Sequence, residues 1–223
     1  MNEINLKDYE LIIFDWDGTL MDSVARIVSC MQAAARKVEL IVPAPEQIKN
    51  IIGLSLPKAI NVLFPSCNEQ QAEDVITQYK HHYIAEDKTP TPLFNNAVEL
   101  LTELRGNDKL LAVATGKGRN GLERVWEISA TKHFFHTSRC ADEALSKPDP
   151  EMLLSILSEL SVSADKAIMI GDTSYDLEMA RNAGVASIGV TYGVHDKDIL
   201  SLYQPKAIVD SLAEIQRLLQ PHH

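Results

Sequence analysis

Two pairs of aspartates are the residues most suited to chemistry in this sequence. Asp15 and Asp17 follow one short apolar run, and Asp172 and Asp176 follow another. If both runs are parallel strands, their carboxyl ends lie at the same edge of a sheet. We therefore expect the four carboxylates to line one crevice.

A threonine and a lysine belong to the same pattern. Thr115 follows a third apolar run, in Thr-Gly-Lys, and Lys147 stands in Ser-Lys-Pro-Asp-Pro at residues 146–150. A hydroxyl and an ammonium group can both donate hydrogen bonds to an anion. The predicted crevice thus combines acidic groups with donors suited to a phosphoryl group.

Four clustered carboxylates repel one another and raise one another's pKa values unless a cation lies among them. Oxygen ligands without histidine or cysteine suit Mg²⁺, so magnesium is the predicted cofactor. With phosphate bound to the metal, Thr115 and Lys147 can donate to its other oxygens. Asp15, at the tip of the strand, is then the predicted nucleophile. Asp17 is the predicted general acid and base for the leaving group and for the attacking water.

Each short motif also has a purely structural interpretation, as a turn, a helix cap or a surface loop. Two further patterns compete with the phosphate site. Residues 116–121 match G-x-G-x-x-G, a pattern typical of dinucleotide-binding loops. His81 and His82 are adjacent on a predicted helix. We favour structural interpretations for both, because neither accounts for the clustered aspartates, and we expect Lys117 and Arg119 to add positive potential or to face solvent.

The chain contains five short apolar runs that are typical of buried parallel strands. Helical patterns with 3.6-residue spacing lie between them, for example at residues 97–106 and 150–160. Strand and helix alternation predicts an α/β fold with a Rossmann-like parallel sheet. The five predicted strands are residues 11–14, 110–114, 167–170, 186–190 and 207–209.

One interval breaks this alternation. Residues 22–93 contain no strand-like run, and their apolar residues keep helical spacing. Pro90 and Pro92 stiffen the return from this interval and could border a hinge. We therefore predict a discontinuous catalytic core at residues 1–21 and 94–223, and an all-helical domain at residues 22–93.

Composition narrows the class of function. The chain has 223 residues and a formal net charge of −10, which speaks against binding to nucleic acid or to an anionic membrane. No run is long enough for a membrane helix, and the N-terminus lacks an export signal. The three widely spaced cysteines form no C-x-x-C motif. These features predict a cytoplasmic enzyme that acts on small molecules, and they leave its oligomeric state open.

Four segments resemble the signature motifs of the haloacid dehalogenase superfamily, in its phosphoglycolate phosphatase-like branch. The likeness extends over nearly the whole chain, because the helical interval is similar in place and length to the cap domain of that branch. The four segments are LIIFDWDGTLMDS at 11–23, TGK at 115–117, SKPDP at 146–150 and GDTSYDLEMARNAG at 171–184.

The resemblance implies a magnesium-dependent phosphatase that hydrolyses a small phosphorylated metabolite through an aspartyl-phosphate. It implies Asp15 as nucleophile, Asp17 as acid and base, and Thr115 and Lys147 as catalytic phosphate anchors. Magnesium would be held by Asp15, by the backbone carbonyl of Asp17 and by Asp172. Asp176 would steady the metal site without binding the ion directly.

The sequence also departs from the pattern. Gly116 stands where relatives usually have asparagine, so its backbone N–H is the expected donor to phosphate. The insert carries Gly53-Leu54-Ser55-Leu56 where similar sugar-phosphate mutases have an arginine after the glycine and serine, which weakens a phosphomutase interpretation. A phospho-acceptor signalling domain gathers similar residues at strand ends, but it has no reason to carry the helical interval. The pattern favours a phosphatase, and the phosphorylated metabolite stays open.

Overall fold

The computed structural model describes residues 4–219 and contains one six-stranded parallel sheet. Its strand order is β3-β2-β1-β4-β5-β6, the order of a doubly wound Rossmann-like sheet. The predicted α/β fold is therefore confirmed. The strands are β1 (Leu11–Phe14), β2 (Leu110–Ala114), β3 (Thr137–Arg139), β4 (Ala167–Gly171), β5 (Ala186–Val190) and β6 (Ala207–Val209).

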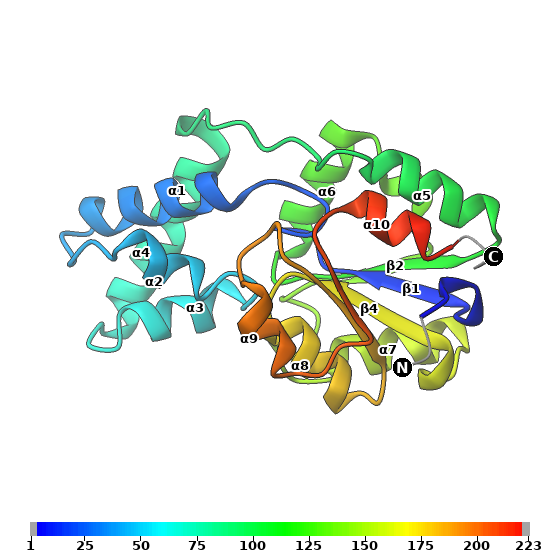
Figure 1. Cartoon of the computed structure of the whole chain (residues 1–223). Coiled ribbons are helices and arrows are strands. Elements are labelled where there is room, and N and C mark those ends of the chain that lie inside the picture. The colour runs from blue at the N-terminus through cyan, green and yellow to red at the C-terminus, as the bar shows by residue number, and fades with distance from the viewer. Residues whose placement is uncertain (1–3, 220–223) are drawn as a thin grey trace.

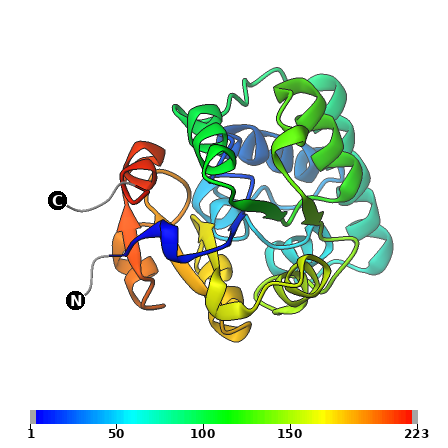
Figure 2. The same ribbon diagram turned by 90° about the vertical axis from the view of Figure 1, so that its right-hand side faces the viewer.

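The central strand β1 is apolar at every position because both of its faces are covered. Ile12 and Phe14 belong to one hydrophobic cluster, and Leu11 and Ile13 to another on the opposite face. Helices α5, α6 and α10 pack on the first face, and α7 and α8 on the second (Figures 1 and 2). The helices around the sheet are α5 (Ala97–Gly106), α6 (Arg119–Ser129), α7 (Glu151–Leu160), α8 (Ser174–Asn182), α9 (Lys197–Ser201) and α10 (Leu212–Arg217).

Strand β3 corrects the sequence prediction, which contained five strands. Its residues Thr137, Ser138 and Arg139 form no apolar run, and only Ser138 is buried. The strand lies at the edge of the sheet and pairs with β2 alone. An edge strand of three residues needs little apolar surface, so the signal used for the buried strands is missing here.

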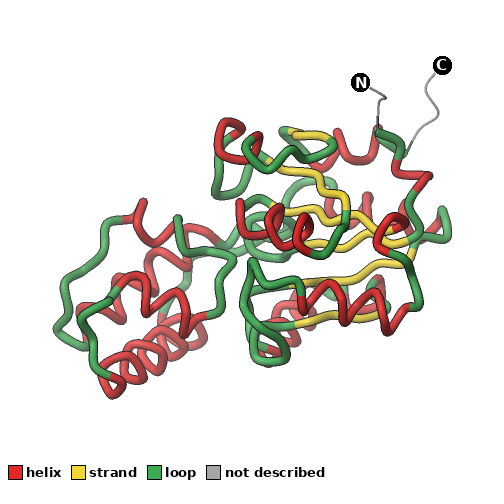
Figure 3. The backbone as a smooth tube through the Cα atoms, turned by 90° about the horizontal axis from the view of Figure 1, so that it is seen from below, coloured by secondary structure: helices red, strands yellow, loops and turns green. Residues whose placement is uncertain are grey.

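The interval between β1 and α5 is entirely helical and forms a separate lobe (Figure 3). We call residues 22–93 the insert and the rest of the described chain the core. The insert has its own hydrophobic cluster, which includes Met31, Ile48, Ile60 and Val75. Its elements are α1 (Val24–Lys37), α2 (Pro45–Lys49), α3 (Leu56–Leu63), α4 (Glu69–His81) and the short π-helix η2 (His82–Glu86). Among residues 4–219, no helix is long and apolar enough to cross a membrane.

The two connections between insert and core run side by side. The N–H of Asp22 donates to the carbonyl of Pro92 at 2.8 Å, and the N–H of Phe94 donates to the carbonyl of Leu20 at 3.0 Å. Both connections are thus held together next to the aspartates that follow β1. The division of the chain into two domains at 22 and 93 stays a prediction.

Polar contacts also join the insert to two segments of the core, the loop at 146–150 and the start of α8. The N–H of Ser55 donates to Oγ of Ser146 at 2.9 Å, and Nζ of Lys58 donates to the carbonyl of Lys147 at 3.2 Å. Oη of Tyr175, at the start of α8, donates to the carbonyl of Asn50 at 2.8 Å. The insert is therefore seated on the edge of the sheet where the strands end.

Candidate active site

A cavity of about 330 Å³ lies between the core and the insert. Its core side is formed at the carboxyl ends of β1 and β2, by residues that include Asp15, Asp17 and Thr115. This is the edge of a doubly wound sheet where ligands bind. The position of the cavity makes it the candidate active site.

Asp15 is the first residue after β1, and its side chain is 1% exposed. Its Oδ1 accepts a hydrogen bond of 2.7 Å from Nζ of Lys147. Its Oδ2 is buried and has no hydrogen-bond partner among the described residues. Burial raises the pKa of Asp15 to about 7, although Lys147 lowers it. Since unpaired buried carboxylate oxygens are costly, this oxygen is a candidate for bonding to a ligand.

Lys147 is fully buried between two carboxylates. Besides contacting Asp15, its Nζ donates to Oδ1 of Asp176 at 2.6 Å. Burial disfavours the ammonium form, but the two carboxylates outweigh it and hold the pKa of Lys147 above its ordinary value. Oδ2 of Asp176 accepts from the N–H and Oγ1 of Thr173 and so caps the start of α8. The structure thus joins the loop at 146–150 to the ends of β1 and β4 through one ammonium group.

Asp172, the residue after β4, is fully buried and has no ion-pair partner among the described side chains. Its Oδ1 accepts from Oγ1 of Thr19 and its Oδ2 from the N–H of Val194, both at 2.9 Å. Burial raises the pKa of Asp172 well above its ordinary value. Gly18 and the chain at Gly193 lie so close that a Cβ at either position would come within 2.4 Å of this carboxylate. The backbone is therefore built around the Asp172 side chain.

Asp17 lies across the cavity from the insert and is 8% exposed. Nζ of Lys117 donates to both of its carboxylate oxygens at 2.8 Å, and Oγ of Ser23 donates to Oδ1. Burial disfavours the charged form of Lys117, but Asp17 outweighs this effect and the pKa of Lys117 lies above its ordinary value. Lys117 therefore has a specific partner, where the sequence suggested only a general positive potential or a solvated side chain.

Thr115 and Gly116 complete the core side of the cavity. Thr115 is fully buried, and its Oγ1 accepts a hydrogen bond of 3.2 Å from the N–H of Lys117. Gly116 lies directly below the insert, because a Cβ there would come within 2.6 Å of the carbonyl oxygen of Gly53 and 2.7 Å of that of Leu54. Glycine is thus required at this position when the insert is seated as described.

The charges of this site fit a divalent cation. Oxygens of Asp15, Asp172 and Asp176 lie within 4.8 Å of one another. In the described chain, Lys147 is paired with Asp15 and Asp176, and Lys117 with Asp17. Two ammonium groups thus face four carboxylates, and Asp172 has no cationic partner among the described residues. All four carboxylates offer oxygen, the ligand type that Mg²⁺ prefers. The residues are therefore able to hold such an ion, with the unpartnered Oδ2 of Asp15 available to it or to a phosphoryl group.

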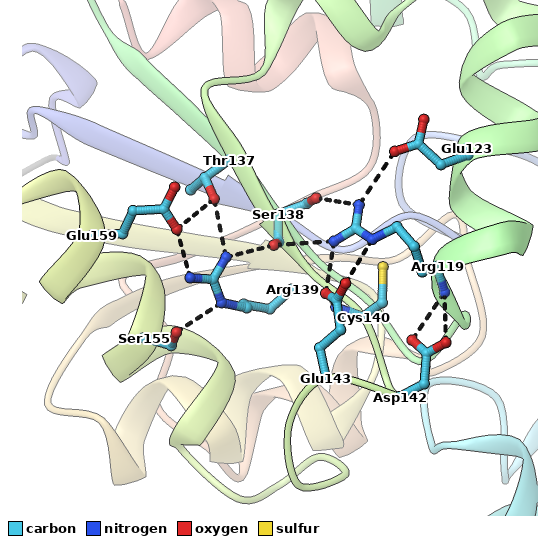
Figure 4. Close-up of polar contacts among 10 residues, drawn as sticks. All are labelled: Arg119, Glu123, Thr137, Ser138, Arg139, Cys140, Asp142, Glu143, Ser155 and Glu159. Atoms are coloured by element: carbon cyan, nitrogen blue, oxygen red, sulfur yellow. Dashed lines mark hydrogen bonds and ion pairs between the residues drawn. The ribbon is translucent and has the colours of Figure 1, made fainter.

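The loop that matches G-x-G-x-x-G is used structurally. The N-terminus of α6 is capped by Asp142, whose carboxylate accepts from the N–H of Arg119 at 2.9 and 3.1 Å. An internal carboxylate thus occupies the position where a dinucleotide phosphate binds in such loops. The Arg119 guanidinium donates to Glu143 at 2.7 Å and to Oγ of Ser138 at 2.8 Å, as Figure 4 shows. This network fixes the loop between β3 and Lys147.

The remaining acidic and histidine clusters have structural roles. Cys140, Asp142 and Glu143 lie close together, but Asp142 caps α6 and Glu143 is paired with Arg119. His81 and His82 both contact Glu86 on the insert, at 2.8 and 2.7 Å. The structural interpretation that the sequence favoured for His81 and His82 agrees with these contacts.

Sequence reasoning missed several residues of the cavity. Ser23 and Lys117 hold Asp17, and Tyr83 of η2 packs against three cations. The Tyr83 ring centroid lies 4.8 Å from Arg26, 5.1 Å from Lys117 and 5.2 Å from Arg124. The sequence did single out Lys117 as a source of positive potential, but it did not predict the pairing of Lys117 with Asp17. The contact of Tyr83 with the core depends on how the insert is seated, and no local pattern in the sequence encodes it.

Comparisons with known proteins agree with this geometry. A curated relative from Dickeya dadantii (strain 3937), named "Probable phosphatase IndB", is 36% identical over 92% of this chain and 91% of its own length. A phosphoglycolate phosphatase from Vibrio cholerae serotype O1 is 28% identical over 94% of this chain and 96% of its own length. The solved structure of a haloacid dehalogenase-like family hydrolase from Streptococcus pneumoniae shares the fold, with a TM-score of 0.82 at 24% identity, and covers 96% of this chain and 99% of that one.

The family model for haloacid dehalogenase-like hydrolases matches residues 12–190. This segment contains the insert and the four motifs, except for Leu11 at the start of the first motif. The family expected from the motifs is therefore confirmed. The chain is a member of the haloacid dehalogenase-like hydrolase family.

Proposed function

We propose that this protein is a magnesium-dependent phosphatase that hydrolyses small phosphomonoesters through an aspartyl-phosphate. The observation that carries the proposal is the state of Asp15 at the end of β1. One of its carboxylate oxygens is held by Lys147, and the other is buried beside the cavity without a hydrogen-bond partner among the described residues. A fixed carboxylate with one free oxygen is suited to attack on phosphorus.

In the first step, Oδ2 of Asp15 forms a bond to phosphorus and the bond from phosphorus to the ester oxygen breaks. Asp17 lines the same cavity and donates a proton to the departing alcohol oxygen. Lys117 and Ser23 hold the Asp17 carboxylate in place between turnovers. In the second step, a water oxygen attacks the phosphorus of the aspartyl-phosphate and Asp17 takes up the proton of that water. Inorganic phosphate and free Asp15 are the products.

The phosphoryl oxygens need donors and counter-charge throughout. The Thr115 hydroxyl, the Gly116 N–H and the Lys147 ammonium are the proposed donors on the core side. Asp15, the backbone carbonyl of Asp17 and Asp172 are the proposed ligands of Mg²⁺, which would supply positive charge to the phosphoryl oxygens when bound. Asp176 acts through Lys147, whose ammonium group it fixes.

Hydrolysis is favoured over transfer to a second sugar hydroxyl. Leu56, which follows Gly53 and Ser55, stands where the resemblance places an arginine in sugar-phosphate mutases; it lines the cavity and is partly exposed. An apolar side chain there offers no hydrogen bond to a second hydroxylated substrate. A cytoplasmic location and a small soluble phosphomonoester as the partner stay predictions from composition and family.

The proposal is tested by measuring phosphate release from a panel of phosphomonoesters with Mg²⁺ and then with excess chelator. We expect turnover of at least one ester with Mg²⁺ and none with chelator. In Asp17→Asn, we expect turnover to fall by about 10²- to 10⁴-fold, and a phosphoenzyme to accumulate that intact-protein mass spectrometry detects. Full activity in chelator, or turnover without a covalent intermediate in this variant, would refute the mechanism.

A further inference from the structure

The cavity has two walls of unlike chemistry. On the core side are the carboxylates, the hydroxyl and the ammonium groups of the proposed phosphoryl site. On the insert side, Lys80 is the one charged lining residue in the described chain, and it is exposed. Most of the insert wall is apolar, with lining residues such as Ile27, Met31, Ile52, Leu54, Leu56 and Ile84.

Two aromatic rings extend this apolar wall. Tyr79 and Tyr83 both line the cavity, with ring centroids 5.8 Å apart and an angle of 38° between the rings. Aromatic faces and aliphatic side chains favour a flat apolar group over a hydrated polar one. The wall is thus suited to the non-phosphate part of a substrate that carries such a group.

The size of the cavity also fits a substrate that carries a flat apolar group. An apolar cavity of roughly 150 Å³ is large enough to hold benzene. The cavity here, at about 330 Å³, is about twice that size. It has room for a phosphoryl group at the core wall and for a ring beside the insert.

Of the cations that line the core side of the cavity, Lys117 has an ion-pair partner, whereas Arg124 has none among the described residues. Lys117 is paired with Asp17 at 2.8 Å, and the guanidinium of Arg124 lies over the face of Tyr83. The carboxylate of Asp142 lines the same region. A carboxylate on the substrate, such as that of phosphoglycolate, would find only Arg124 as an unpaired cation on the core side of the described cavity. Placed against the aliphatic side chains of the insert instead, it would be moved out of water, and this transfer is unfavourable.

We infer that the insert selects phosphomonoesters whose alcohol carries an apolar group about the size of a benzene ring, and disfavours those whose alcohol carries a carboxylate. This inference rests on the proposed phosphatase function. It concerns the substrate class alone, because the phosphoryl chemistry belongs to the core.

The test compares three monoesters of primary alcohols, so that the leaving groups are similar: ethyl phosphate, benzyl phosphate and phosphoglycolate. With the whole protein and Mg²⁺, we expect kcat/KM for benzyl phosphate to exceed that for ethyl phosphate by about tenfold to hundredfold, from burial of the ring. Phosphoglycolate should be hydrolysed no faster than ethyl phosphate. A higher kcat/KM for phosphoglycolate than for benzyl phosphate would overturn the inference.

A charge placed in the wall should reduce this preference. Leu56 lines the cavity at the start of α3 and is partly exposed, so L56R can carry a guanidinium without burying it fully. We expect the ratio of kcat/KM for benzyl phosphate to that for phosphoglycolate to fall by at least about tenfold. Ile84 is 60% exposed and also lines the cavity, so I84R repeats the test at a second position.

Val62 provides the matched control. It lies on the same helix as Leu56, is 57% exposed and does not line the cavity. V62R should leave the ratio unchanged, and an equal shift in this variant would attribute the effect to net charge and contradict the inference. If the wild-type protein hydrolyses none of the three esters or any other phosphomonoester, the proposed function fails. If it hydrolyses ethyl phosphate but benzyl phosphate no better, only the inference about the insert fails.

Discussion

The core and the insert contribute to one cavity, but the side chains they bury there differ. Those of the core are charged and unfavourable to bury, and those of the insert are apolar and favourable to bury. On the core side, Asp15, Asp172 and Lys147 are buried at 1% exposure or less. Burying charged groups is unfavourable unless each has partners, and these residues are surrounded by donors, acceptors and one another. On the insert side, residues such as Ile52 and Leu54 are buried at low cost, because they are apolar.

This difference shows why the two halves of the site have different functions. A buried charge is stable only when hydrogen-bond or ion-pair partners surround it. Most substitutions in the core wall should therefore reduce either the stability of the fold or the rate of the reaction. The apolar wall can change one side chain at a time, since a neighbouring apolar residue fits nearly as well. We therefore expect substitutions of the buried charged residues of the core to affect all substrates equally. Substitutions in the apolar wall of the insert, or ones that displace this wall, should affect substrates selectively.

The largest effect is expected for Asp15→Asn. An amide has nearly the same shape as a carboxylate but cannot form the aspartyl-phosphate, so kcat should fall by about 10⁴-fold or more on every substrate. Phosphate release from ethyl and benzyl phosphate measures this loss, and circular dichroism checks the fold. Asp165→Asn is the matched control, since Asp165 is an exposed aspartate of the core. Selective loss on one substrate would show that Asp15 contributes to substrate choice and would break the comparison.

Next in size is the effect of Lys147→Met on stability. Removal of the ammonium group leaves Asp15 and Asp176 facing each other in a buried site, and this should lower the free energy of unfolding by about 3–5 kcal/mol. Urea denaturation measures the change, and phosphate release should be lost on all substrates.

Lys109→Met distinguishes this charge effect from the mere loss of a buried lysine. Lys109 is 9% exposed, and its ammonium group donates to the backbone carbonyls of Lys7 and Tyr9 rather than to carboxylates. We expect a smaller loss of about 1–3 kcal/mol with activity retained. If the two substitutions lowered the free energy of unfolding equally, the contribution of Lys147 to stability would not depend on its pairing with the two carboxylates.

The same contrast explains how much could be predicted from the sequence. The apolar run at β1 and the aspartates after it predicted a buried strand and a site. A single polar motif at a strand end is often only a turn or a helix cap, but several such motifs at successive strand ends favour a shared site. The edge strand β3 was missed, since Ser138 alone is buried there and no apolar run marks it. Residues of the core wall could thus be predicted from the sequence where polar residues directly follow a buried apolar run.

The insert wall was not accessible in this way. Ile27 and Met31 have helical spacing, which predicts a buried helix face. The structure places these side chains in the hydrophobic cluster of the insert and also on the cavity. The helical spacing of apolar residues indicates that a side chain is shielded from water. It does not indicate whether a neighbouring helix or a substrate shields it.

A smaller effect is expected for Gly116→Ala. The added methyl group would collide with the carbonyl oxygens of Gly53 and Leu54, so the insert has to lift away from the core. Such a displacement should lower kcat/KM by roughly tenfold to hundredfold. Benzyl phosphate should lose more than ethyl phosphate, because its ring depends on the insert wall. Gly106→Ala is the control, since a Cβ at Gly106 would meet nothing within 4 Å. An equal loss on both esters would show that Gly116 acts through the phosphoryl group alone.

The smallest effect is expected for Tyr175→Phe, which removes one hydrogen bond between core and insert. The Tyr175 hydroxyl donates to the carbonyl of Asn50, while its ring packs against the hydrophobic cluster of the insert. Phenylalanine keeps the ring, and the carbonyl of the exposed Asn50 can bind water instead, so kcat/KM should fall by only about two- to fivefold. Because this hydrogen bond stabilises the seated insert without touching the apolar wall, ethyl and benzyl phosphate should lose the same factor. Tyr203→Phe, on the core and away from the cavity lining, should change neither value. A change in the ratio of the two esters in Tyr175→Phe would show that the seating of the insert and the chemistry of its wall are not separate determinants.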